Sequence, residues 1–116
     1  MSKQFENPTT YEVTLADAQQ WVKDYQKDKP ASAAKAFLID VEELNQIINL
    51  SDQVKYVRVY FGMDYNFEEH PEKLLLVPVD VKGIDMINTT GPSQIYDFIT
   101  PCPPTCDYNS PINPKP

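Results

Sequence analysis

Proline placement constrains the fold of this chain more than any other feature of its sequence. Seven of the eleven prolines lie in the segment from Pro92 to Pro116. Proline fixes its own φ angle and lacks the backbone N–H that helix interiors and central strands require. Helices and strands are therefore expected mainly before this segment. We predict one domain at residues 1–99 and a Pro/Cys-rich, partly disordered tail at residues 100–116.

Length and charge narrow the class of protein. A chain of 116 residues with 41% hydrophobic residues suits a single folded domain with one core. The formal net charge is −7 and Arg58 is the only arginine, so nucleic acid is not expected as a partner, because phosphate binding needs a basic patch. The acidic excess also repels anionic membrane surfaces. Since the sequence shows neither a signal-peptide pattern nor an apolar run of membrane-spanning length, we predict a cytoplasmic protein.

Two amphipathic helices are predicted in the first half of the chain. Thr14 starts the first helix, with Asp17 in the capping-box position, and Pro30 lies beyond its end. Asp40 starts the second helix, of about ten residues, with Glu43 in the equivalent position. Each helix carries one apolar stripe at helical spacing. The stripes consist of Leu15, Ala18, Trp21, Val22 and Tyr25 in the first helix and of Val41, Leu44, Ile47 and Ile48 in the second.

Four segments have the composition of β-strands. A short apolar run at 36–39 precedes the second helix, and the alternating run of β-branched and aromatic residues at 54–61 is the clearest strand. A third strand at 74–81 contains Pro78, which predicts an edge position or a bulge there. Residues 84–87 follow a turn and are expected to return as a further antiparallel strand.

Turn residues and the order of elements together predict the fold class. Gly62 is expected to end the strand 54–61, and the sequence Asp80-Val81-Lys82-Gly83 has hairpin-turn chemistry. The order of helix, strand, helix and three-stranded meander predicts an α+β fold. We expect both helices to pack on a small mixed, mostly antiparallel sheet of about four strands. The strand 36–39 is expected to join that sheet beside one of the later strands.

Six stretches of the sequence together carry a resemblance to known sequences. They are Thr-Leu-Ala-Asp-Ala-Gln-Gln-Trp-Val at 14–22, Ala-Phe-Leu-Ile-Asp at 36–40, Val-Arg-Val-Tyr-Phe-Gly at 57–62, Leu-Leu-Leu-Val-Pro-Val-Asp at 74–80, Gly-Ile-Asp-Met-Ile at 83–87 and Tyr-Asp-Phe-Ile-Thr-Pro-Cys-Pro-Pro-Thr-Cys at 96–106. With these stretches, most of the chain resembles an uncharacterised set of small bacterial hypothetical proteins that end in a Cys-Pro-Pro-x-Cys tail. That set has no established activity, so the resemblance implies no catalytic residue. It implies that the sheet and the tail belong to one recurring unit.

The first candidate site is the face that Tyr56, Arg58 and Tyr60 share on the strand 54–61. A guanidinium between two aromatic rings is suited to binding a carboxylate, a phosphate or a protein partner. Cross-strand packing on a solvent-facing strand explains the same pattern at least as well. If the helices cover the opposite face, this face is either exposed or covered by the apolar segment 95–99.

The second candidate site is formed by Cys102 and Cys106, the only cysteines of the chain. Their spacing allows a small disulfide, a metal site or a redox couple. Zinc normally needs four ligands, which one chain lacks and two chains together would supply, and the prolines prevent the helix that starts a typical redox motif. The plain alternative is a stiff polyproline-like tail whose thiols pack against the sheet. Because a cytoplasmic protein is expected, free thiols are the default state.

The loop 63–73 is a weaker candidate. Its acidic side chains provide oxygen ligands of the kind that calcium prefers, but they lack the spacing of an EF-hand, so a solvated hairpin loop is the favoured interpretation. His70 is the only histidine, has no catalytic partner at a recognisable spacing and is expected to be exposed. The acidic residues of the loop are Asp64, Glu68, Glu69 and Glu72.

We predict a small non-enzymatic protein that acts by binding a protein partner or by self-association. The three glycines form no phosphate-binding loop, no catalytic constellation is recognisable, and no cofactor is predicted. Two alternatives stay open. One is a thiol-dependent redox or metal function centred on Cys102 and Cys106, and the other is a sensor of small anions or ligands that uses Tyr56, Arg58 and Tyr60.

Overall fold

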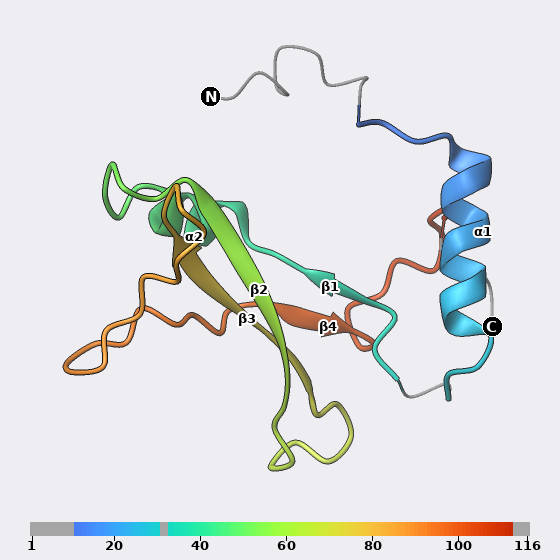
Figure 1. Ribbon diagram of the computed structural model, residues 1–116. Helices are drawn as coiled ribbons and strands as arrows, with labels where there is room; N and C mark the ends of the chain where they lie inside the picture. The colour runs from blue at the N-terminus through green and yellow to red at the C-terminus, as the bar shows by residue number, and fades with distance from the viewer. Residues whose placement is uncertain (1–10, 31–32, 113–116) are drawn as a thin grey trace. The chain divides into compact units, whose positions relative to one another are not determined.

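The computed structural model of the protein describes residues 11–30 and 33–112. Its two helices and four strands confirm the predicted α+β class. The last residues of the predicted tail, 113–116, lie outside the described residues. In chain order the elements are α1 (Leu15–Gln26), β1 (Ala36–Leu38), α2 (Val41–Ile48), β2 (Tyr56–Met63), β3 (Glu72–Val79) and β4 (Thr100–Cys102) (Figure 1).

The described residues divide into two compact units. The first contains α1 and residues 107–112, and within it the side-chain amide of Gln19 donates to the carbonyl of Pro111 at 2.8 Å. The second contains the described residues from 33 to Cys106, and with them α2 and all four strands. This division differs from the boundary predicted after residue 99, because the first residues of the predicted tail form a strand of the second unit.

The strands form two antiparallel two-stranded sheets instead of the single sheet that the sequence predicted. β1 does pair with a later strand, but that strand is β4, with Ala36 opposite Cys102 and Leu38 opposite Thr100. Pro101 lies in the middle of β4 and has no N–H to donate to a neighbouring strand. This proline keeps the β1–β4 ladder short and confines β4 to an edge.

Both helices start where the sequence predicted. The Thr14 hydroxyl accepts from the Asp17 N–H at 3.1 Å at the start of α1. The Asp40 carboxylate accepts from the N–H groups of Glu42 and Glu43, at 2.9 and 3.2 Å, at the start of α2. These caps satisfy N–H groups that have no partner inside the helix. The expectation that both helices pack on one sheet is confirmed for α2 alone, since α1 belongs to the other unit.

β2 and β3 form a long antiparallel hairpin. They pair along their whole length, from Tyr56 opposite Val79 to Met63 opposite Glu72. Gly62, which was expected to end the strand, lies inside it. The register continues through this glycine without a bulge, so the connecting loop begins at residue 64, one residue later than the sequence indicated.

Pro78 explains why the third strand of the predicted meander is missing. Its carbonyl accepts from the Met86 N–H at 2.8 Å, on the side of β3 that faces away from β2. A continuing antiparallel ladder would need the reverse bond from the N–H of residue 78, which proline lacks. The segment 84–87 is therefore reduced to one bridge between Val79 and Asp85. Pro78 thus interrupts the ladder on this side of β3, but the predicted bulge is absent and β3 lies between β2 and the bridged residues Tyr96 and Asp85.

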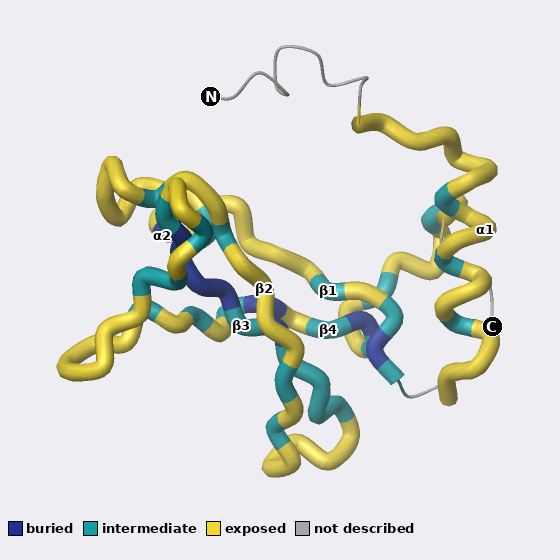
Figure 2. Tube along the Cα trace, viewed as in Figure 1, coloured by how far each residue is buried: buried dark blue, intermediate teal, exposed yellow. Residues whose placement is uncertain are grey.

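The core of the second unit lies between α2 and β3. Its buried members are Ile47 from α2, Leu74 and Leu76 from β3, and Ile99. Figure 2 shows β3 as the buried strand and its partner β2 as largely exposed. The half-buried side chains that pack against this core are Phe37, Leu44, Val57, Tyr96 and Phe98. Part of the segment 95–99 thus covers the α2 face of the sheet. The sequence had suggested this segment as a cover for the opposite face, that of Arg58.

Candidate functional site

The alternation of β2 places Tyr56, Arg58 and Tyr60 on one face, as predicted. Two of the residues opposite them, Val77 and Val79, are buried. The face residues themselves stay exposed, Tyr56 by 58% and Tyr60 by 42%. The three residues lie opposite Val79, Val77 and Leu75 of β3, respectively.

The turn after β3 brings a carboxylate onto this face. The Asp80 carboxylate accepts from the N–H groups of Lys82 and Ile84, at 2.9 and 3.0 Å. The Gly83 N–H donates to the Asp80 carbonyl at 3.0 Å, and Gly83 has a φ of +82°, a left-handed conformation that favours glycine. The chain reverses here, so that Asp85 returns alongside the end of β3.

Asp85 is shared by Arg58 and Tyr60. The Arg58 Nη1 and the Tyr60 hydroxyl donate to different oxygens of the Asp85 carboxylate, and the Arg58 Nη2 donates to the Gly83 carbonyl at 3.2 Å. The neighbouring Tyr60 hydroxyl, followed by the negative charge of Asp85, raises the pKa of the Arg58 guanidinium. The guanidinium is thus already paired within the chain, and an external anion would have to displace Asp85. Tyr56 takes no part in this cluster.

Asp85 was not predicted from the sequence to be a partner of Arg58. The two residues come from segments that are not neighbours in the chain, and many acidic residues were equally available. The available signal was the turn at 80–83, which was recognised. A strand that returns after this turn puts the second residue past Gly83 beside β3, within reach of a long side chain on β2.

The outer edge of β2 carries backbone groups that pair with no other strand among the described residues. Leu76 exchanges two backbone hydrogen bonds with Tyr96, both 2.9 Å, so its N–H and C=O face away from β2. In an antiparallel ladder, a residue that faces away lies opposite another that faces away. Val59 lies opposite Leu76, so its N–H and C=O point outward from the hairpin. The same alternation applies to Val57, Phe61 and Met63. These four residues are called the β2 edge below.

Within the described residues, β2 pairs with no strand other than β3. The β2 edge also exposes apolar side chains: Phe61 is 87% exposed, Met63 51% and Val59 42%. Natural edge strands are usually protected by Lys, Pro or a bulge, and β2 has none of these. It contains no acidic residue, and its one charge, Arg58, is balanced by Asp85. The edge is therefore suited to accept a further strand.

The cysteine pair lies at the end of β4. Cys102 and Cys106 form a disulfide, with their Cα atoms 4.6 Å apart. The Thr105 N–H and hydroxyl both donate to the Pro101 carbonyl, at 3.1 and 2.8 Å, and so close the turn that brings the two cysteines together. The structure therefore differs from the default expectation of free thiols. Cys102 is buried where β4 meets β1.

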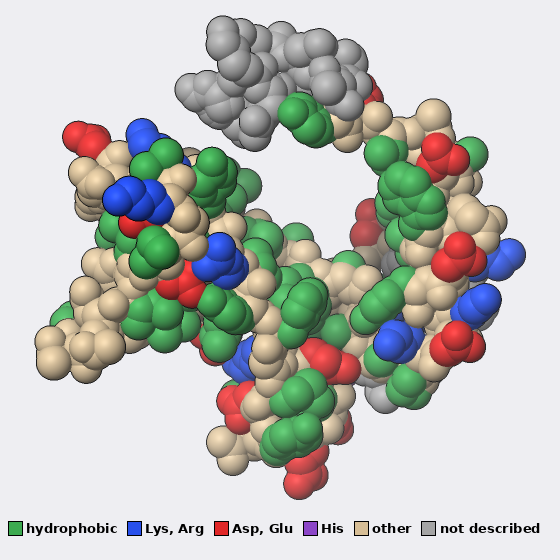
Figure 3. Space-filling view, in the orientation of Figure 1, with side chains coloured by type: hydrophobic (Ala, Val, Ile, Leu, Met, Phe, Trp, Pro, Cys, Tyr) green, Lys and Arg blue, Asp and Glu red, His purple; other side chains and the backbone are tan. Residues whose placement is uncertain are grey.

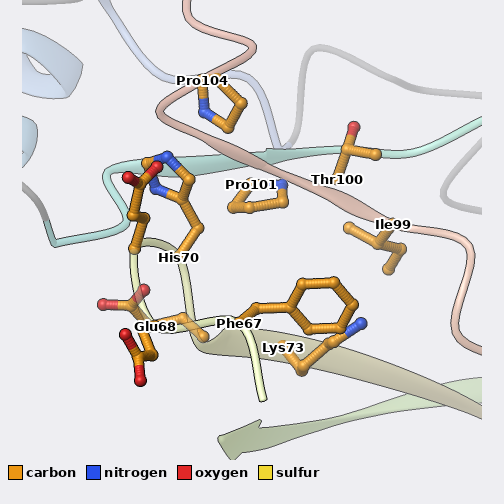
Figure 4. A pocket seen from close by; sticks show the side chains of 10 residues that line it. Phe67, Glu68, His70, Lys73, Ile99, Thr100, Pro101 and Pro104 are labelled. Atoms are coloured by element: carbon orange, nitrogen blue, oxygen red, sulfur yellow. The ribbon is translucent and has the colours of Figure 1, made fainter. Parts of the chain in front are cut away.

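A pocket of about 450 Å³ lies between this turn and the hairpin loop (Figure 4). Its volume is within the range of small-molecule sites. Pro101 and Pro104 line it from the cysteine turn, and Phe67 and His70 line it from the loop. At the loop end of the hairpin, Figure 3 shows hydrophobic side chains interspersed with acidic ones.

Two of the charged groups at this pocket already have structural partners. Lys73 forms an ion pair with Asp97 at 2.8 Å, and the Glu72 carboxylate accepts from the Ala34 N–H at 3.2 Å. His70 is half-buried, not exposed as predicted, because it packs into the pocket wall. Its Nδ1 is buried without a hydrogen-bond partner. The hairpin loop and the turn that the cysteine pair closes therefore line the same pocket, although the sequence indicated them as two separate candidate sites.

Among the described residues, no group of three or more His, Cys, Asp or Glu side chains is arranged to hold a metal ion. None of the helices in the same residues has the length and apolar character needed to cross a membrane.

Comparison of the chain with protein families, curated proteins and solved structures finds no match. The resemblance to small bacterial proteins therefore stays a prediction. The function must be argued from the geometry of the second unit alone.

Proposed function

We propose that the protein is a non-enzymatic interaction module that binds an extended protein segment as an additional strand along the β2 edge. The observation that carries the proposal is the outward orientation of the N–H and C=O groups of Val57, Val59, Phe61 and Met63 on an eight-residue strand. Strand addition supplies affinity through main-chain hydrogen bonds and specificity through alternate side chains.

The composition of the β2 edge indicates the chemistry of the partner segment. Side chains of an added strand would lie beside Phe61, Met63 and Val59, which are exposed and apolar, so apolar residues at alternate positions are favoured. The formal net charge of −7 repels acidic segments. The expected partner is therefore an extended segment with alternating apolar residues and no acidic residues.

A peptide with the sequence of residues 55–63 tests this function. Nuclear magnetic resonance of the full-length chain should show shifts of the Val59 and Phe61 amide signals when this peptide is added. The control is the same peptide with prolines in place of Val59 and Tyr60, which cannot pair as a strand along either of its edges. If neither peptide affects the β2 amides of the folded chain, the proposal is wrong.

The disulfide supports a second candidate, a thiol-dependent function of Cys102 and Cys106. The pair closes a turn that also forms one wall of the pocket containing His70. Counting free thiols in protein extracted from cells under thiol-blocking conditions tests both this function and the cytoplasmic location that we propose. A pair that switches between thiol and disulfide supports the thiol function, whereas a permanently oxidised pair favours a structural role and an oxidising compartment.

The sensor alternative has less support. The pairing of Arg58 with Asp85 and Gly83 leaves an external anion to compete with a carboxylate of the same chain. Thermal stabilisation by phosphate or acetate that is lost in Arg58→Ala would support it.

A further inference from the structure

We infer that the strand bound at the β2 edge is β2 of a second copy of the chain, so that two hairpins form one antiparallel sheet of four strands. This inference rests on the proposed function and deepens it by naming the partner. Three features of β2 support it: the set of outward-facing residues, the charges at its two ends, and the side chains that a symmetric pairing brings together.

The outward-facing residues select one register. Each of them must lie opposite an outward-facing residue of the second copy, because only these have free N–H and C=O groups. Antiparallel pairing with Tyr60 at the symmetry axis places Val57 opposite Met63 and Val59 opposite Phe61, and the reverse pairs follow by symmetry. No other antiparallel register pairs all four residues of the β2 edge. The arrangement is isologous, which is the commonest symmetry of soluble dimers.

The charges that flank β2 favour the antiparallel direction. Lys55 precedes the strand and Asp64 follows it. Antiparallel pairing brings the Lys55 end of one copy to the Asp64 end of the other, twice by symmetry, whereas parallel pairing would bring like charges together. Each chain has a formal net charge of −7, and a strand without acidic residues is a surface where two copies meet with little repulsion.

The side chains of the β2 edge match in the same register. Phe61, 87% exposed in the single chain, would lie directly across from Val59 of the partner subunit, on the same face of the joined sheet. Aromatic and β-branched residues form favourable cross-strand pairs. The two copies of this pair cover the most exposed apolar side chain of the strand. A second copy thus supplies both the backbone groups and the apolar side chains that the edge requires.

Cysteine cross-linking tests the register. In a full-length background with Cys102→Ser and Cys106→Ser, Tyr60→Cys should form a dimer in mild oxidant, because the two Cα atoms would lie about 4.5 Å apart across the axis. Tyr56→Cys is the matched control, since it changes another tyrosine on the same face of the same strand. Its two copies would be separated by eight positions along the strand, about 27 Å, and should not cross-link.

Light scattering of the unmodified chain over a range of concentrations keeps the test independent of the variants. The expected result is a mass that rises to twice the monomer mass, together with cross-linking of Tyr60→Cys alone. Equal cross-linking of both variants, or a dimer in which Tyr60→Cys does not cross-link, places the interface elsewhere and overturns the inference. A chain that stays monomeric at every concentration also overturns it. If such a monomer still binds the peptide of residues 55–63, the strand-binding function stands and only the second copy is wrong.

Discussion

Leu76 and Tyr96 exchange two backbone hydrogen bonds of 2.9 Å across the side of β3 that faces away from β2. This pairing determines which backbone groups of the hairpin point outward. Val59 lies opposite Leu76, so its N–H and C=O groups must also point away from the partner strand. Within the residues that the structure describes, β3 has neighbours on both sides and is buried, whereas β2 has a neighbour only on the side of β3. The edge of β2 is thus exposed because the segment that contains Tyr96 returns beside β3 and not beside β2.

Leu76→Ala should destabilise the second unit strongly, whereas Phe61→Ala should hardly affect it. Leu76 is 1% exposed in the core, and a buried Leu→Ala change typically costs about 2–5 kcal/mol. Phe61 is exposed, so its replacement should stay within about 0.5 kcal/mol. Urea unfolding at low protein concentration measures both, because dilution removes any contribution of dimer formation. Equal losses of unfolding free energy for the two variants would show that Leu76 does not lie in the core.

Phe61→Ala should instead weaken self-association. The substitution removes the cross-strand pair of Phe61 with Val59 of the partner subunit, twice by symmetry. Loss of both pairs should weaken the affinity of the dimer by about two- to thirtyfold. Phe67→Ala is the control, because Phe67 is an exposed aromatic residue in the hairpin loop outside β2. Sedimentation equilibrium measures the dissociation constants. A larger effect of Phe67→Ala than of Phe61→Ala would contradict the proposed interface.

Reduction of the disulfide should lower the free energy of unfolding by about 2 kcal/mol, the chain-entropy value for a loop this short. Guanidinium unfolding with and without reductant measures the difference. The variant with Cys102→Ser and Cys106→Ser should have the stability of the reduced protein and should not respond to reductant. If reduction is verified by thiol titration and stability is unchanged, the turn at Thr105 holds the cysteines together without the bond.

Asp40→Ala should destabilise the second unit by about 0.5–2 kcal/mol, because two N–H groups at the start of α2 lose their acceptor. Asp40→Asn should restore most of this loss, since asparagine also caps helices well. Asp52→Ala, which removes an exposed aspartate outside α2, is the charge-matched control. Thermal unfolding measures the series, and a similar loss for Asp40→Ala and Asp52→Ala would rule out a capping effect.

The raised pKa of Arg58 predicts how its contribution depends on pH. A raised pKa in the folded state gives stability that is fully present below the unfolded pKa and is lost only as pH rises through the folded pKa. For arginine both lie in the strongly alkaline range. The difference in unfolding free energy between the wild type and Arg58→Gln should therefore be constant from about pH 6 to about pH 9. A difference that shrinks steadily across this range would contradict the pairing of Arg58 that the structure shows.

The features that the sequence predicted well are local ones. The caps at Thr14 and Asp40 depend on residues two or three positions apart, and the common face of Tyr56, Arg58 and Tyr60 follows from the alternation of a strand. The turn at Asp80 follows equally from its own residues.

The features that the sequence missed depend on distant partners. β1 pairs with a segment that its prolines had marked as tail, because Pro101 offers no N–H yet can still occupy a short edge strand. Asp85 and Arg58 meet only through the packing of the returning chain on β3. The β2 edge was missed for another reason: it is defined by the direction of backbone groups, which side-chain identity does not encode.

Hydrogen exchange of the individual β2 amides tests most directly whether the β2 edge is a docking surface. At high protein concentration the amides of Val59 and Phe61 should be protected, and dilution should remove that protection. The amides of Arg58 and Tyr60 face β3 and should stay protected at every concentration, which provides an internal control within the same strand. Rapid exchange of Val59 and Phe61 at all concentrations, with and without the peptide of residues 55–63, would contradict a docking role for this edge.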